Sequence, residues 1–253
     1  MHWTVLGSDS ALGAVRTLVS VRSRVRDVPS VRRNRMPSVL LKFVMAVSGA
    51  VMLLFLLMHM VGNLKIFIGA DELNAYAAWL RTLLEPAVPY EGVLWFVRVG
   101  LVVAIAAHIW SAALLTLRAR RARPVKYAVR NKVSGSYAAR TMRWGGVIIV
   151  LFLIYHLLDL TTGTLNPNGK HLEVYQNVGA DFTPGRWYVT LFYTLAVVAV
   201  GFHVRHGLWS ALQTLGWSTG AREKVLKGIS TVFAVFLTAG FLAVPLAVTF
   251  GLA

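Results

Sequence analysis

The chain has 253 residues, of which 57% are hydrophobic and only 14% are charged, and it contains no cysteine. Because soluble domains carry roughly 25% charged residues, this composition excludes an ordinary soluble protein. The lack of thiols excludes disulfides, zinc–thiolate sites, cysteine-held iron–sulfur clusters and covalent c-type haem.

An N-terminal region of 35 polar, arginine-rich residues is followed by five apolar segments. These segments cover approximately 37–61, 92–117, 144–164, 187–215 and 229–252. Each is about as long as a helix that crosses 30 Å of hydrocarbon. The pattern predicts an all-α integral membrane protein with five transmembrane helices. Residues 1–35 are expected to form a basic cytoplasmic segment, and residues 36–253 the membrane domain.

The basic residues fall on one side of this predicted topology. Twenty of the 26 lysines and arginines lie within residues 1–42, 118–143 and 216–228, whereas the loops 62–91 and 165–186 hold four. By the positive-inside rule the N-terminus is cytoplasmic and the C-terminus lies outside. This distribution explains the net charge of +16 without nucleic acid as a partner. It also predicts attraction to anionic membrane lipid or to an acidic peripheral subunit.

Five of the seven histidines lie in the first four apolar segments. They are His59, His108, His156, His203 and His206. Without His206, each of these four helices carries one histidine, at separations of 49, 48 and 47 residues, and the fifth helix carries none. A single intramembrane histidine often just hydrogen-bonds a neighbouring helix. Four in consecutive helices favour bis-histidine haem, because neutral imidazole is a good ligand for haem iron.

The depth of each histidine constrains how these residues pair. At 1.5 Å per residue, His59 lies roughly 25 Å and His156 roughly 20 Å from the cytoplasmic helix ends, but His108 only roughly 15 Å. The depth of His203, also roughly 20 Å, suits either level. If the first and third helices supply an outer pair, the second and fourth remain for an inner one. We therefore predict one haem between His59 and His156 and another between His108 and His203.

The sequences around these histidines are also informative. They read "HMVGNLKIF" at 59–67, "AHIWSAALLTL" at 107–117, "RWGGVIIVLFLIYHLLDL" at 143–160 and "FHVRHGLWSALQTLG" at 202–216. These stretches resemble the cytochrome b membrane-anchor subunit of succinate dehydrogenases and fumarate reductases. The form they resemble is the single-chain, five-helix, two-haem type of bacterial enzymes that commonly use menaquinone. The resemblance runs from about residue 36 to the end of the chain.

The resemblance implies a subunit of respiratory complex II, which belongs to the tricarboxylic acid cycle, in the bacterial plasma membrane. The chain would bind two haems b, contribute a quinone site, and anchor a flavoprotein subunit and an iron–sulfur subunit. FAD, the iron–sulfur clusters and succinate oxidation itself belong to those partners. In the family, the first- and third-helix histidines bind the distal haem iron and the other two bind the proximal one. That assigns His59 and His156 to the distal haem, and His108 and His203 to the proximal haem.

Three basic side chains near these ligands are candidates for haem propionate contacts. Arg205 and His206 follow the fourth ligand, and Arg98 lies in the second apolar segment. Arginine suits paired hydrogen bonds to a carboxylate, although it also snorkels to the membrane interface. His206 lies about 4.5 Å along the helix from His203. It is therefore expected to contact a propionate, a quinone or the partner interface, or simply to bond a neighbouring helix.

Two acidic side chains are candidates for the quinone side of the distal haem. Asp159 lies one turn after His156, where a position at the helix edge is the slightly favoured interpretation. The resemblance implies an acidic residue for quinol proton exchange in the loop after the first helix. That loop offers Asp71, Glu72, Glu85 and Glu91, of which Glu85 is the preferred choice. Some relatives carry a glutamate two residues before the fourth ligand for transmembrane proton transfer. This chain has Gly201 there, so no such route is predicted.

Two alternatives remain open from the sequence. The same anchor could serve a fumarate reductase, since the direction of electron flow depends on potentials and partners. A different class is a non-redox membrane protein, a transporter or an anchor, whose histidines relay protons or join helices.

Overall fold

The computed structural model describes residues 36–122 and 135–253, and the predicted basic segment 1–35 lies outside the described residues. Pro37–Ala253 form one compact unit. The described residues form helices and no strand. The long helices are α2 (Ser38–Asn63), α4 (Gly92–Arg121), α5 (Gly135–His156), α7 (Trp187–Thr214) and α8 (Glu223–Thr249). The chain is thus all-α, as predicted.

Five spans within the described residues are long and apolar enough to cross a membrane. They are Ser38–Ile68, Gly92–Arg121, Met142–Thr161, Pro184–Thr214 and Glu223–Thr249. Each includes most of one predicted apolar segment, which confirms a multi-pass helical membrane protein. The last helix begins six residues earlier than predicted. There Glu223 lies in the first turn and pairs with Lys227 one turn later, and both features stabilise a helix start.

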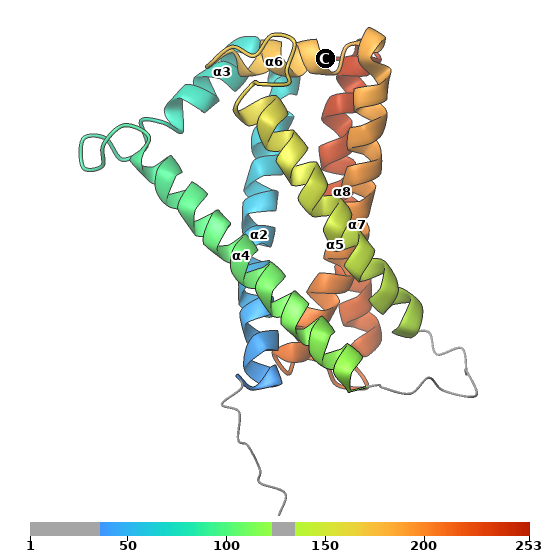
Figure 1. Ribbon diagram of the computed structural model, residues 1–253. Coiled ribbons are helices and arrows are strands. Elements are labelled where there is room, and N and C mark those ends of the chain that lie inside the picture. Colours follow the sequence, from blue (N-terminus) through green and yellow to red (C-terminus); the bar gives the residue numbers. More distant parts are fainter. Residues whose placement is uncertain (1–35, 123–134) are drawn as a thin grey trace, which may run out of the picture. The chain divides into compact units, whose positions relative to one another are not determined.

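The short elements lie at one end of the bundle, together with the C-terminus (Figure 1). They are the 3₁₀ helices η1 (Leu64–Ile68) and η3 (Pro184–Arg186), the π-helical turn η2 (Leu157–Thr161), and the α-helices α3 (Ala70–Trp79) and α6 (Val174–Asp181). We call this end the α3–α6 end. The opposite end, where α2 and α8 begin and α4 ends, is called the basic end.

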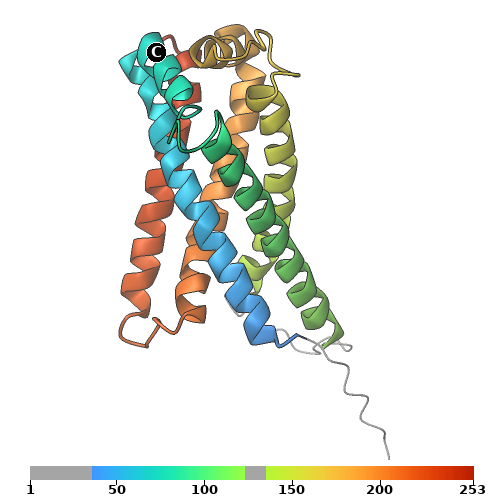
Figure 2. The same cartoon turned by 90° about the vertical axis from the view of Figure 1, so that its left-hand side faces the viewer.

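Helix α2 packs against α4, α7 and α8, while α5 packs against α7 (Figures 1 and 2). A buried apolar cluster joins α2, α7 and α8 through Met60, Val204, Ala234 and Leu237. The membrane spans of α4 and α5 are only 6% buried, against 28% and 33% for the spans of α7 and α8. Of these four helices, α4 and α5 thus have the fewest residues buried by the rest of the chain.

Glycine at position 201 allows α7 and α8 to approach closely. A Cβ atom there would overlap with the side-chain oxygen of Thr238 on α8. The space that a glutamate side chain would need at this position is therefore filled by α8. This packing supplies a physical reason for the small residue at position 201.

We expect Gly201→Val to destabilise the chain by about 1–3 kcal/mol, because added atoms in a packed interface force neighbouring side chains to shift. Gly207→Val is the matched control, since Gly207 lies on the same helix and nothing lies within 4 Å of its added Cβ. Thermal unfolding in detergent would measure both. Equal loss in the two variants would mean that helix propensity, rather than the contact with Thr238, explains the effect.

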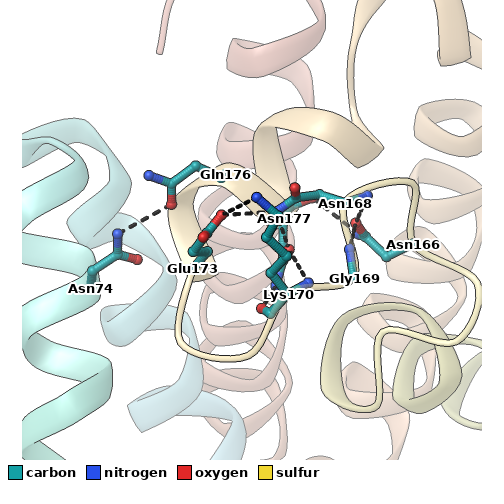
Figure 3. A network of polar contacts seen from close by, with 8 residues as sticks. All are labelled: Asn74, Asn166, Asn168, Gly169, Lys170, Glu173, Gln176 and Asn177. Atoms are coloured by element: carbon teal, nitrogen blue, oxygen red, sulfur yellow. Dashed lines mark hydrogen bonds and ion pairs between the residues drawn. The ribbon is translucent and has the colours of Figure 1, made fainter.

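A polar network ties the α3–α6 end together (Figure 3). Asn177 of α6 donates to the carbonyl of Lys170, and Asn168 donates to the side chain of Asn177 at 2.7 Å. Asn74 of α3 donates to Gln176 and accepts from the backbone N–H of Tyr175. The loop after η2 and helix α3 therefore hold α6 in place across the end of the bundle.

Candidate functional site

The four evenly spaced histidines meet in two pairs. His59 of α2 and His156 of α5 have ring centroids 5.9 Å apart, and His108 of α4 and His203 of α7 have ring centroids 6.3 Å apart. These are the pairs that the depth argument selects. The His108 ring lies beside Met45, and His59 is 14 residues further along α2, or about 21 Å. The two pairs therefore lie at two levels of the bundle.

The spacing within each pair fits one metal ion bound between two imidazoles. Metal–imidazole bonds of about 2 Å on opposite sides of an ion place the ring centroids about 6 to 6.5 Å apart. No three His, Cys, Asp or Glu side chains within the described residues are grouped to hold a metal ion. A porphyrin supplies four nitrogen ligands itself, so two histidines suffice for haem.

Hydrogen bonds orient the His108 ring for such a role. Its Nδ1 lies 3.1 Å from the carbonyl oxygen of Met45 and 3.3 Å from the hydroxyl of Ser48. Donation from Nδ1–H to this carbonyl leaves the Nε2 lone pair free to bind a metal, as second-shell partners of ligating histidines do. Gly49 also adjoins this ring, since an added Cβ would lie 3.5 Å from it.

His156 has a comparable partner. Its Nδ1 lies 3.4 Å from the hydroxyl oxygen of Tyr193 on α7. Because the Tyr193 hydroxyl donates to Asp159 at 2.8 Å, its oxygen is available to accept from the imidazole. This arrangement again leaves Nε2 free. The His59 ring opposite is held by apolar contacts, stacking on Phe55 at 5.3 Å and approaching Phe241 at 5.9 Å.

The fourth ligand candidate and its neighbour differ in their surroundings. His203 is half-buried, and its Nδ1 has no hydrogen-bond partner within the part of the chain that the structure describes. Gly146 of α5 is near its ring, with 3.9 Å to an added Cβ. His206 is half-buried one turn closer to the basic end. Arg205 is exposed and donates from Nε to Thr231 of α8, so its contact with a propionate stays a prediction.

Two further candidates, Arg98 and Glu85, lie in α4 and in the loop before it. Arg98 forms an ion pair with Glu91 at 3.3 Å, and Glu91 also pairs with Arg81. Glu85 is exposed in the loop before α4. Among the described residues, no hydrogen bond or ion pair joins Arg98 or Glu85 to a histidine pair. The roles suggested for these two residues therefore stay predictions.

Asp159 lies in η2 just after the end of α5, at the helix edge, but its side chain does not face outward. The side chain is fully buried, with 0% exposure, and it accepts the Tyr193 hydrogen bond. The η2 turn contacts α6, and Tyr193 of α7 lies against the Asp159 carboxylate, so that other elements enclose this side chain. Beside it lies Asp181, the last residue of α6, which the sequence reasoning missed together with Tyr193. A signal for Asp181 was present, because five residues later Arg186 supplies a partner for it.

The chain was compared with protein-family models, with curated proteins and with solved structures, and none of them matches. The resemblance to cytochrome b anchor subunits therefore depends on the histidine-centred stretches of this sequence.

Proposed function

We propose that this chain is the membrane-anchor cytochrome b subunit of a bacterial succinate:quinone oxidoreductase. The observation that carries the proposal is the meeting of four intramembrane histidines in two pairs, each spaced to hold one metal ion. When bound, two haems b would carry electrons between an iron–sulfur partner and a quinone, for which menaquinone is the expected species.

The residues of the chain have distinct tasks in this proposal. The imidazoles of His59 and His156 hold one haem, and those of His108 and His203 hold the other. Met45 and Tyr193 fix the orientation of the rings by accepting from Nδ1. All four histidines are only half-buried by the chain itself. Few residues of the α4 and α5 spans are buried by the chain, as expected if a cofactor or lipid covers these helices.

The orientation in the membrane is part of the same proposal. Arg118, Arg120 and Arg121 end α4 at the basic end, and Arg222 immediately precedes α8 there. The positive-inside rule places this end in the cytoplasm. The His108–His203 pair would then face the flavoprotein and iron–sulfur subunits. The α3–α6 end, with the C-terminus, would lie outside the plasma membrane.

We expect the purified full chain to show two b-type haems per polypeptide in reduced-minus-oxidised optical spectra. Expression with an ample haem supply, followed by a pyridine haemochrome assay, gives the ratio of haem to protein. Co-purification of a flavoprotein and an iron–sulfur protein would identify the complex. A folded chain that takes up no haem would contradict the redox assignment and favour a transporter or non-redox anchor with histidines as helix contacts.

A further inference from the structure

Two carboxyl groups without a role so far lie together beneath the α3–α6 end. Asp159 and Asp181 are both fully buried, with 0% exposure. Tyr193 links their surroundings, because its hydroxyl donates to Asp159 and its ring packs against Phe182, the residue after Asp181. Asp181 accepts from Arg186 at 2.9 Å, and Asp159 accepts from Tyr193 at 2.8 Å. The other oxygen of each carboxyl group has no donor within residues 36–122 and 135–253.

One proton shared between these two groups would supply a hydrogen-bond donor for the oxygens that lack one. It would also reduce the negative charge of the two groups from two to one. Two ionised carboxyl groups beside one guanidinium would leave a buried negative charge, which is costly. Burial, together with the hydrogen bond and charge of Asp159, raises the pKa of Asp181 to about 7, against the opposing effect of Arg186. The carboxyl group of Asp181 therefore takes up and releases a proton near neutral pH.

The surroundings of Asp181 contain few other groups that could control this proton. Those that act electrostatically on the pair or on its neighbours are Asp159, Arg186, Tyr155, Tyr188 and Tyr193. On α3, Asp71 is exposed, while Glu72 and Tyr76 both adjoin Lys65. The end of α8 that packs here, residues 241–249, has no ionisable side chain.

The pair connects in two directions. Toward the bundle, Asp159 accepts from Tyr193, whose oxygen lies 3.4 Å from Nδ1 of His156. Toward the surface, the Arg186 side chain is 24% exposed, and the Tyr188 ring beside its guanidinium is exposed as well. The Arg186 side chain thus connects the carboxyl pair to the surface. The Tyr193 side chain connects it to the His59–His156 pair.

We infer that Asp159 and Asp181 form a proton-binding site coupled to the charge at the His59–His156 pair. The carboxyl pair takes up one proton from the α3–α6 end when one electron reaches the group that these histidines hold, and releases it when the electron leaves. The electron comes from a one-electron donor such as a reduced iron–sulfur centre, and the only bond made is one carboxyl O–H. Added negative charge nearby favours the protonated acid. This inference rests on the proposed function.

Potentiometric titration of the purified full chain at several pH values around neutrality tests the inference. We expect the equilibrium constant for reducing one of the two haems to fall by up to tenfold per pH unit, about 59 mV for a one-electron couple. The other haem should show a much weaker dependence. Asp181→Asn should flatten the dependence, and Glu173→Gln, which alters an exposed carboxylate of the same end, should leave it unchanged.

A second variant guards against misfolding of Asp181→Asn. Arg186→Gln removes the charge that opposes protonation, so the pH window should move upward rather than disappear. Reduced-minus-oxidised infrared spectra should show a protonated-carboxyl band that Asp181→Asn removes. If the unmodified chain binds two haems whose reduction potentials do not depend on pH, this inference is wrong but the proposed function still holds. A folded chain without haem would overturn the proposed function, and this inference with it.

Discussion

His203→Ala is expected to reduce the haem content from two per chain to one, while His206→Ala keeps both. The reason is geometric. His203 faces His108 with a centroid separation of 6.3 Å, whereas His206 lies about 4.5 Å further along the helix axis. Removal of the His203 imidazole therefore removes one of the two proposed protein ligands at that level. The pyridine haemochrome assay and redox-resolved spectra of each purified variant measure the loss.

The two variants form a matched pair, because both remove a half-buried imidazole from the same helix. Circular dichroism would show whether each remains helical. Added imidazole should restore haem binding to His203→Ala by occupying the space that the substitution opens, and this rescue separates loss of a ligand from loss of the fold. The assignment is wrong if His206→Ala loses one haem and His203→Ala retains two.

Combining substitutions should reveal which histidines act together. We expect His59→Ala and His156→Ala to lose the same spectral component, and the double variant to lose no more than either single one. His59→Ala combined with His108→Ala should lose both components, because these residues lie in different pairs about 21 Å apart along α2. Effects at such distant sites are usually additive, whereas those within one site are not.

Redox titration of the single and double variants distinguishes these outcomes, since each remaining component keeps its own potential. The double variant of His108 and His203 serves as the control, because it should retain the component that the first double variant loses. Loss of only one component from the His59 and His108 combination would refute the pairing.

The helices and the set of histidines could be predicted from sequence because both depend on local properties. Apolar blocks of about 20 residues indicate membrane helices whatever their neighbours are, and all five predicted segments lie largely within helices of the structure. Errors occurred where a boundary depends on polar residues, as at Glu223, where an ion pair extends α8. The rise per residue sufficed to compare depths, but it left the level of His203 open.

Contacts between distant parts of the chain were decided only by the tertiary structure. Asp181 lies 22 residues after Asp159, and nothing local indicates that α6 folds back over η2 to bring them together. Likewise, the resemblance singled out position 201, but it did not indicate that Thr238 of α8 fills the space beside Gly201. The order of apolar blocks and histidines along the chain determined that it spans a membrane and that, His206 apart, each of four helices carries one histidine. How these helices pack determined which imidazoles face each other and which carboxyl groups share a buried site, because side-chain proximity depends on three-dimensional packing rather than on sequence spacing.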